Sequence, residues 1–288
     1  MRPRSAAGRE ARAVGQPDPH CPDEPPERLA HMQLQATRHA LALGTKPLDP
    51  ADRARLLDHA RARPDSAWRR GDHISKANNA HYTNTLTQFE HALKNSYNSL
   101  EGDVRVEDGM PVMAHDKGRT DGLTFRDWAE IGNESGRMLR IDLKEHAALA
   151  PVVKELQRLD VPDWRASFNI EALLPGVAHI DVGYLKELRA QYPLSPISLN
   201  SPLPLRPIHD ALKAAARQVG GTMMTAFQSP LATRDAVAYL KPEFIVNAWN
   251  NPALWQPRDI ARETARLRAL GVDGMIDLRR RDDPLAKP

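Results

Sequence analysis

Carboxylates and a histidine are concentrated in one short stretch of the chain. The segment SLEGDVRVEDGMPVMAHD, residues 99–116, carries Glu101 and Asp103 in a run expected to form a strand, and His115 closes the next apolar run. Side chains two residues apart on a strand face the same side. Carboxylate oxygens are the ligands that Mg²⁺ and Ca²⁺ prefer, and an imidazole can transfer a proton near neutral pH. The segment therefore predicts a site that combines a divalent cation with acid–base chemistry.

Polar residues also end the other apolar runs of the chain, where the carboxyl ends of strands are expected. In barrels of parallel strands the active site lies at those ends. A lysine at the carboxyl end of a barrel strand would face an anionic substrate, and phosphate is the natural candidate. Taken singly, such residues are also typical of solvated strand faces, side-chain packing and hydrogen bonds to loop backbone. The residues concerned are His73, Asp142, Lys144, Asn169, Glu171, Asn200, Asn247, Trp249 and Asp277.

From about residue 66, short apolar runs alternate with helical patterns. Eight predicted strands separated by helices favour a (β/α)8 barrel, an α/β fold with a parallel sheet. A doubly wound open sheet is the alternative, and the missing G-x-G-x-x-G after the first strand weakens it. The predicted strands span 67–75, 98–106, 138–144, 166–173, 196–200, 222–227, 243–249 and 273–278, with 110–115 as a hairpin partner of the second. The predicted helices span 84–95, 124–131, 146–158, 182–191, 207–218, 231–239 and 257–269.

The chain before the barrel has a different composition. Residues 1–26 carry six prolines and several charges, and read as a basic, disordered tail. Residues 27–65 form a predicted helical extension of two helices. The first spans 27–43, and the second is capped by Asp49 and ends before Pro64. This extension packs on the barrel or binds a protein partner, and residues 66–288 form the barrel domain. A chain that starts near residue 66 is expected to keep its melting temperature.

Several classes of protein are disfavoured by composition. Cys21 is the single cysteine, so neither an intrachain disulfide nor a zinc site of cysteines is possible. No run approaches the roughly 18 apolar residues that span a bilayer, and the first 30 residues lack the apolar core of a secretory signal. The net charge of +3 gives no reason to expect a nucleic-acid partner. The sequence does not identify the cellular compartment. The protein is either cytoplasmic or exported by a route that needs no such signal.

The order of the motifs resembles the opening of glycerophosphodiester phosphodiesterase barrels, and NSLEGDV and IDLK are similar to spider-toxin phospholipases D. Over residues 70–278 the chain most resembles the menorin family, a branch of the same superfamily. That resemblance rests on PVMAHD, TFRDW, RIDLKEHAALAPVVKEL, FNIEALLPG, FIVNAWN and GVDGMIDL. The phosphodiesterase-like elements are His73, Asn84-Thr85-Leu86, Glu101-Gly102-Asp103-Val104, Pro111-Val112 and His115-Asp116.

The resemblance implies a role for each matching residue. It makes His73 and His115 the acid–base or nucleophilic pair, and Lys144 a phosphate contact. The phosphodiesterases follow their first histidine with Arg-Gly, whereas Ile74-Ser75 follows His73 here, and His81 is a competing first histidine. His73 is preferred because its distance to Asn84 suits the family and because it ends a predicted strand. The implied metal ligands are Glu101, Asp103 and Asp142, and the predicted further substrate contacts are Glu171, Asn247 and Trp249.

The expected function is that of a phosphodiesterase dependent on Mg²⁺ or Ca²⁺. Its substrate would be a glycerophosphodiester-like small molecule or a lysophospholipid. A first alternative is a lyase that forms a cyclic phosphate from a lysophospholipid or a sugar phosphodiester. A second alternative is a barrel without catalytic activity that acts as a binding module or effector, addressed to its partner by the N-terminal helices.

Overall fold

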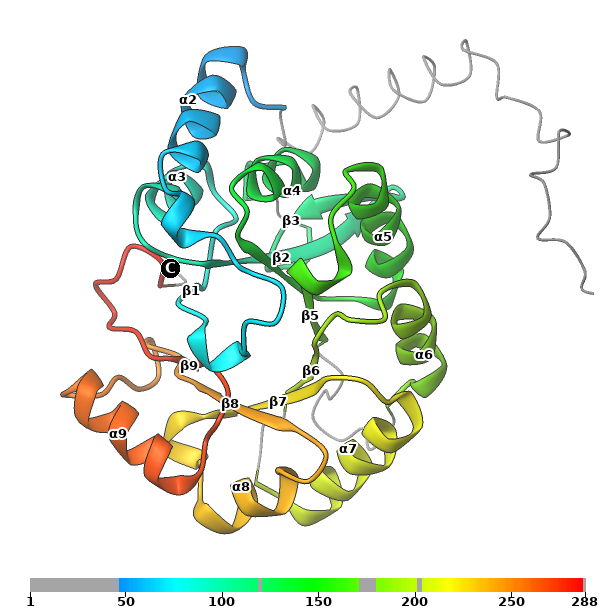
Figure 1. Cartoon of the computed structure of the whole chain (residues 1–288), viewed down its shortest axis with the longest axis vertical. Coiled ribbons are helices and arrows are strands. Elements are labelled where there is room, and N and C mark those ends of the chain that lie inside the picture. The colour runs from blue at the N-terminus through cyan, green and yellow to red at the C-terminus, as the bar shows by residue number, and fades with distance from the viewer. Residues whose placement is uncertain (1–46, 119–120, 171–179, 201–203, 287–288) are drawn as a thin grey trace, which may run out of the picture.

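Parallel strands wind into a nearly closed barrel in the computed structural model, which describes residues 47–118, 121–170, 180–200 and 204–286 (Figure 1). The strands follow the order β1-β2-β4-β5-β6-β7-β8-β9, and the hairpin strand β3 pairs antiparallel with β2. The predicted (β/α)8 barrel is therefore confirmed. The strands are β1 (Asn79–Ala80), β2 (Ser99–Glu107), β3 (Met110–Met113), β4 (Met138–Leu143), β5 (Ala166–Ile170), β6 (Ile197–Leu199), β7 (Met223–Gln228), β8 (Ile245–Trp249) and β9 (Ile276–Asp277).

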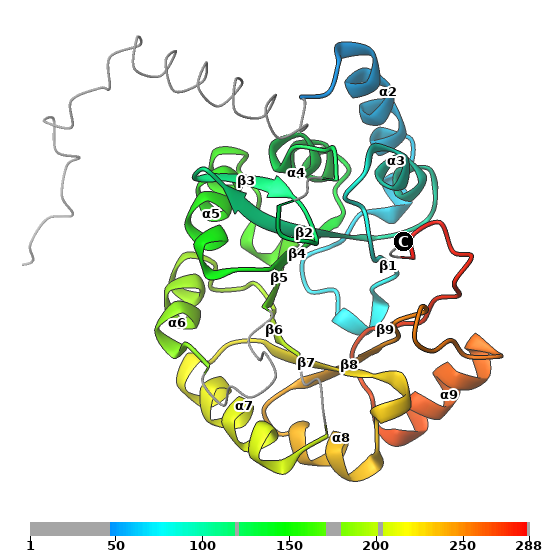
Figure 2. The same cartoon turned by 180° about the vertical axis from the view of Figure 1, so that it is seen from behind.

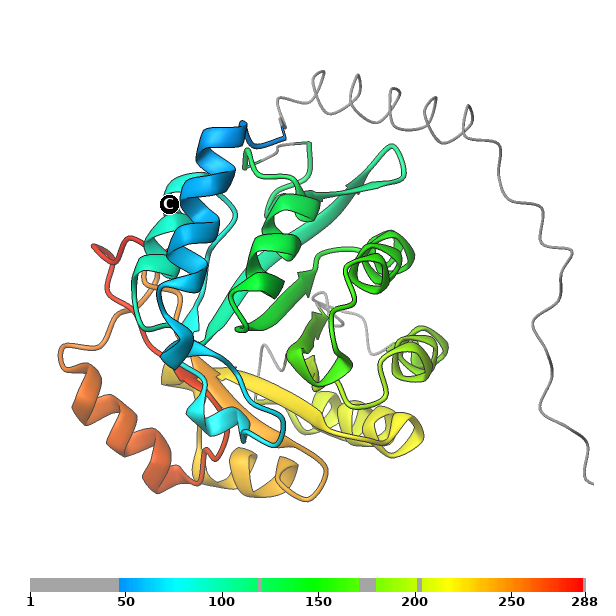
Figure 3. The same ribbon diagram turned by 45° about the horizontal axis from the view of Figure 1, so that its top comes forward.

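Helices form an outer ring around the strands, as the view from behind and the tilted view also show (Figures 2 and 3). Several begin where the sequence supplies a capping side chain: Thr85, Thr124 and Asp259 each accept a hydrogen bond from a backbone N–H of the first turn. None of the helices in the described part of the chain has the length and apolar character needed to span a bilayer. The helices are α2 (Pro50–Arg61), α3 (Leu86–Lys94), α4 (Phe125–Glu134), α5 (Leu149–Arg158), α6 (Val182–Gln191), α7 (Arg206–Val219), α8 (Arg234–Leu240) and α9 (Ile260–Leu270).

The segment 67–75 is not a strand, and this prediction was wrong. Gly71 adopts φ +89 in a turn in which Asp72 N–H donates to the Arg69 carbonyl at 2.9 Å. The apolar side chains of Trp68 and Ile74 are buried against Met138 and Met275 instead of forming a sheet ladder. Met138 begins β4 and Met275 precedes β9, so this cluster closes the barrel at the amino ends of its strands. The first strand is the two-residue β1.

Side chains close the barrel where its first and last strands meet. No backbone ladder joins β1 and β9 among the described residues. Instead, Asn79 Nδ2 donates to Asp277 Oδ2 at 3.0 Å, and the guanidinium of Arg279 donates to the Asn79 carbonyl. All three residues are buried, so this polar seam replaces the missing hydrogen bonds of the ladder.

Helix α2 covers α3 and α4. Its own residues Leu56 and Ala60 are buried, and Arg53 Nη1 lies 3.2 Å from Asp127 Oδ1 on α4. The second helix predicted in the extension is therefore present and contacts the barrel, whereas residues 1–26 and the helix predicted over 27–43 lie outside the described residues. The domain boundary at 66 stays a prediction. A chain that starts there would expose this apolar face, so we now expect its melting temperature to fall.

The contribution of α2 can be measured with a single substitution. Leu56→Ala should lower the free energy of unfolding by about 2–5 kcal/mol, because Leu56 is fully buried in the core and its removal leaves a cavity. Arg61→Ala, which removes an exposed ion pair with Glu134, should cost no more than about 1 kcal/mol. Urea denaturation measures both values. Equal effects of the two substitutions would mean that α2 does not pack on the barrel in solution.

Candidate functional site

A cavity of about 250 Å³ lies at the carboxyl ends of the barrel strands. Side chains from every parallel strand or the residue that follows it line this mouth. Because partners in a parallel ladder point to the same side, the register carries them there: Glu101 lies opposite Arg140, Asp103 opposite Asp142, and Asp142 opposite Asn169. The predicted site residues that line the mouth are Glu101, Asp103, His115, Asp142, Lys144, Asn247 and Trp249.

Two predicted site residues are not among those that line the mouth. His73 is exposed and caps the short helix Ile74–Lys76, and its neighbour Ile74 belongs to the cluster at the opposite end of the barrel. The selection of His73 over His81 is corrected by this geometry, because the residue that follows β1 at the mouth is His81. Glu171 lies outside the described residues.

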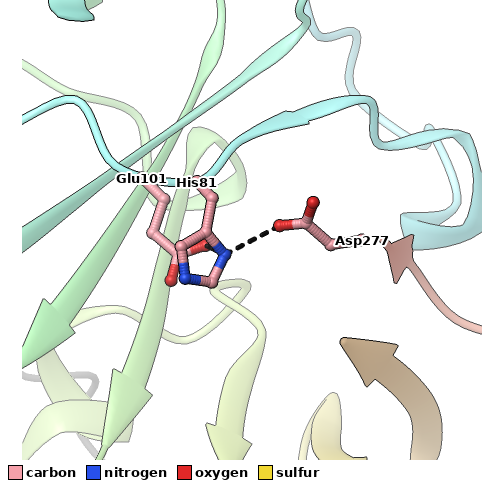
Figure 4. Close-up of side chains that lie close together, drawn as sticks. All are labelled: His81, Glu101 and Asp277. Carbon is pink, nitrogen blue, oxygen red and sulfur yellow. Dashed lines mark hydrogen bonds and ion pairs between the residues drawn. The ribbon is translucent and has the colours of Figure 1, made fainter. Parts of the chain in front are cut away.

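His81 is held between two buried carboxylates (Figure 4). Its Nδ1 lies 2.9 Å from Asp277 Oδ2 and 3.9 Å from Glu101 Oε2. Enclosure in the mouth lowers the pKa of the imidazole, but Glu101 and Asp277 outweigh this effect and raise the pKa to about 9. The imidazolium is therefore the stable form at neutral pH. Asp277 holds Nδ1, so Nε2 is the atom that can exchange a proton with a ligand.

This arrangement predicts a pH dependence of stability in the metal-free protein. The folded pKa of His81, about 9, exceeds the unfolded value of 6.5. Its contribution to stability is thus complete below pH 6.5 and is lost as the pH rises through 9. In the presence of a chelator, the free energy of unfolding should fall by up to about 3 kcal/mol as the pH rises from 6.5 through 9. Urea titrations of the wild type and His81→Gln at several pH values test this. The variant should lack the part of the pH dependence of the free energy of unfolding that His81 causes. The same slope in both proteins would contradict the assignment.

Arg140 also lines the mouth, and it was not among the predicted site residues. It is buried on the lumen face of β4, with Nε 3.1 Å from Glu101 Oε2. Asn79 Nδ2 donates to the same oxygen at 2.5 Å. Burial raises the pKa of Glu101, and the charges of His81 and Arg140 offset only part of that rise. Arg140 stands two residues before Asp142 in RIDLK, so strand alternation alone would have placed it at the mouth.

Lys144 bridges two of the predicted metal ligands. Its Nζ lies 3.0 Å from Asp103 Oδ1 and 2.8 Å from Asp142 Oδ2. Burial raises the pKa of Asp142, but the charges of Lys144 and Arg140 outweigh it, so the pKa lies below its usual value. Asn84 fixes the other side of Asp103: its Nδ2 donates to Oδ2 at 2.8 Å, and its Oδ1 accepts from the Asp103 N–H at 2.9 Å.

His115 enters the mouth on the loop after β3. Its Nδ1 lies 2.7 Å from Asp116 Oδ1, and its backbone N–H donates to Asp121 Oδ2 at 3.2 Å. The same Asp121 oxygen accepts from Tyr82 Oη and Asn84 Nδ2, both at 2.9 Å. Asp121 therefore ties the His115 loop to the segment after β1. No strand pattern pointed to Asp121, because it lies in a loop.

The mouth offers two sets of possible metal ligands. Nitrogen and oxygen atoms of His81, Glu101 and Asp277 lie within 4.8 Å of one another. In the metal-free protein the pKa of His81 is raised, so a cation at that set would have to displace the proton of the imidazole. The predicted ligands form the other set: Asp103 and Asp142 converge on the Lys144 ammonium, and Glu101 lines the same cavity, but the three carboxylates do not lie as close together as the first set. All-oxygen ligands of this kind suit Mg²⁺ or Ca²⁺.

The two remaining predicted contacts, Asn247 and Trp249, lie on β8. Asn247 Oδ1 accepts from the Met275 N–H at 2.7 Å, which joins β8 to the start of β9. Trp249 lies beside His81, with ring centroids 6.2 Å apart and planes 27° from parallel. The Cβ of any larger residue at Gly102 would come within 2.4 Å of Met113 Cε and 3.1 Å of the Trp128 ring. The glycine between the two acidic residues therefore gives room for α4 and not for a ligand.

The solved structures that resemble this chain are remote. A glycerophosphoryl diester phosphodiesterase from Parabacteroides distasonis has a TM-score of 0.45 at 11% identity, covering 76% of this chain and 87% of that chain. A tryptophan synthase from M. tuberculosis has a TM-score of 0.40 at 17% identity, with coverage of 63% and 71%. An N-acetylneuraminate lyase from Mycoplasma synoviae has a TM-score of 0.33 at 11% identity, with coverage of 61% and 68%.

The comparisons of sequence find one family and no individual protein. No curated protein sequence matches the chain. The family comparison does find a match, and it spans β1, β2, β3, β4 and β5. These strands and the residues that follow them supply Glu101, Asp103, Asp142 and both histidines of the mouth. Residues 73–173 match the Menorin N-terminal domain, which supports the menorin family named from the motifs.

Proposed function

We propose that this chain is a divalent-metal-dependent phosphodiesterase that acts on a glycerophosphodiester-like substrate at the mouth of the barrel. One observation carries the proposal: a single cavity is lined by two imidazoles, four carboxylates and a lysine. A binding module has no need for a proton donor, a proton acceptor and a cation site in one place. The match of residues 73–173 to the Menorin N-terminal domain supports the proposal through the menorin family, which the motifs relate to the glycerophosphodiester phosphodiesterases.

The carboxylates of Glu101, Asp103 and Asp142 would hold Mg²⁺ or Ca²⁺. When bound, the cation would withdraw charge from the phosphoryl oxygens and orient the phosphate. It would also compete with the Lys144 ammonium for Asp103 and Asp142, to which Lys144 is bonded. Lys144 is then available to a phosphate oxygen at the same mouth.

The two histidines divide the proton transfers. His81 is protonated at neutral pH and donates from Nε2 to the departing oxygen, while Asp277 holds its Nδ1. His115, oriented by Asp116 through Nδ1, accepts the proton of the attacking hydroxyl at Nε2. Water as the attacking group gives a phosphomonoester, and a hydroxyl of the substrate gives a cyclic phosphate. The identity of the product therefore separates a hydrolase from a lyase.

The metal site is tested by calorimetry with Mg²⁺ and with Ca²⁺. Asp103→Ala should abolish tight binding of the cation, because it removes one of two converging carboxylates. Asp235→Ala, a substitution on the outer helix α8, is the matched control and should bind as the wild type does. Unchanged affinity in Asp103→Ala would refute the ligand assignment. Phosphorus NMR of the reaction mixture then identifies the product by its chemical shift.

A further inference from the structure

The mouth is divided into a charged arc and an uncharged arc. The charged arc comprises β9, β1, β2 and β4, which are adjacent in the barrel and carry His81, the carboxylates and their cationic partners. The other arc comprises β5, β6, β7 and β8. Among the lining residues that the structure describes, this arc carries no charged side chain and instead presents amides and one indole. The two sides of the cavity therefore suit chemically different parts of one ligand.

Three amides on the uncharged arc keep hydrogen-bonding capacity for a ligand. Asn169 is buried, and no described group bonds its Oδ1. Asn200 uses Oδ1 to accept from Ser198 Oγ at 3.4 Å, and Asn251 uses Oδ1 to accept from the Ala253 N–H at 2.9 Å. Asn169 Nδ2 faces the Asp142 carboxylate, whose pKa it lowers, so this amide offers a ligand its Oδ1. Nδ2 of Asn200 and Nδ2 of Asn251 donate to no other described residue. An amide both donates and accepts, so the set matches hydroxyl groups, which do the same.

The aromatic ring of this arc lies where the two arcs meet. Trp249 stands beside His81 at a centroid distance of 6.2 Å. An indole offers a flat apolar face and one N–H donor. A ring that carries C–H groups on its face and hydroxyls on its edge can lie against Trp249, with its edge toward the amides. A phosphate attached to that ring would then lie next to His81 on the charged arc.

Other head groups fit this surface less well. A quaternary ammonium is held by a cage of several aromatic rings or by carboxylates. Among the described residues of the uncharged arc that line the cavity, Trp249 is the single aromatic one. An acyl chain needs a long apolar channel, whereas this arc presents amides and small side chains such as Ala226 and Pro252. The volume of about 250 Å³ is just below the usual range for small-molecule sites, so it suits a compact polar group.

From this division we infer that the uncharged arc binds a cyclic polyol, such as a sugar or an inositol, as one side of the phosphodiester. The inference rests on the proposed function, because it places the phosphate of the same substrate against the charged arc. Trp249 supports the face of the ring, and Asn169, Asn200 and Asn251 bond its hydroxyls.

Binding is tested without catalysis, by saturation-transfer NMR on the full, metal-free chain. The probes are methyl β-D-glucopyranoside, myo-inositol and choline, each alone. We expect saturation transfer to the protons of the two polyols and none to choline. Trp249→Ala should weaken the polyol signals on the order of fivefold. Trp249→Tyr keeps an aromatic ring and should weaken them less. Trp255→Ala is the matched control: this tryptophan belongs to the same loop region, does not line the cavity and should have no effect.

A choline signal as strong as the polyol signals, or equal loss in the Trp249 and Trp255 variants, would overturn the inference. So would the absence of any polyol signal from a folded wild type. The same chain is then assayed with glycerophosphoinositol and glycerophosphocholine. The inference predicts faster turnover of the inositol diester, on the order of tenfold in kcat/KM. Polyol binding without turnover of either diester would contradict the proposed function alone, so the two failures are distinguishable.

Discussion

Replacing His81 with alanine should reduce the phosphodiesterase rate by about 10²–10⁴-fold, the usual loss when a general acid is removed. The same substitution at His73 should leave the rate unchanged. The reason is position: His81 follows β1 and lines the mouth, whereas His73 caps a short helix beside the cluster that closes the opposite end. The two histidines are eight residues apart in sequence, so the pair of variants is a matched comparison.

His81→Ala also leaves Glu101 and Asp277 without the imidazolium between them, and this can lower stability. His81→Gln is therefore made beside it, because an amide can still donate to Asp277. Both variants are compared with the wild type at a temperature well below the melting temperature of each. A rate loss in His73→Ala with full activity in His81→Gln would reverse the assignment and return the first imidazole to His73.

Removal of Arg140 should lower the free energy of unfolding by about 3–5 kcal/mol, as expected when one partner of a buried ion pair is lost. Arg140 and Glu101 are 4% exposed each, and their charged groups lie 3.1 Å apart. Arg140→Met leaves the Glu101 carboxylate in the lumen with Asn79 and His81 as its remaining partners. Urea denaturation measures the change.

The matched control is Arg126→Met, which removes an arginine that is half exposed and paired with Glu155. It should cost no more than about 1 kcal/mol. The double variant Arg140→Met with Glu101→Leu should recover much of the loss, since apolar residues often replace a buried ion pair without cost. If Arg140→Met lowered the free energy of unfolding no more than Arg126→Met does, Arg140 would not be the counter-ion of Glu101.

Four residues of the charged arc could be predicted because strand alternation is a strong local pattern. Glu101 with Asp103, and Asp142 with Lys144, stand two residues apart in runs long enough to be identified as strands, and the structure places all four at the mouth. The first strand could not be identified, because a two-residue strand has no periodicity to detect. The apolar residues that imitated a strand, Trp68 and Ile74, instead close the barrel at its amino end.

The partners within the site could not be predicted from the sequence. Arg140 meets Glu101 because β2 and β4 pair in a register that joins residues 39 positions apart, and His81 meets Asp277 across the seam where the barrel closes. Such contacts depend on how strands align, and no local pattern records that alignment. The same holds for Asp121, which joins two loops.

Turnover of a phosphodiester in the presence and absence of a divalent cation tests the central claim most directly. Phosphorus NMR would follow the wild type with glycerophosphoinositol and glycerophosphocholine as separate substrates, with Mg²⁺ and then with an excess of chelator, beside Glu101→Gln. A phosphomonoester or cyclic-phosphate resonance that grows with Mg²⁺ and is absent with chelator and in Glu101→Gln is the predicted result. Equal product with Mg²⁺ and with chelator, or no product from a wild type that binds Mg²⁺, would contradict a metal-dependent phosphodiesterase at this mouth.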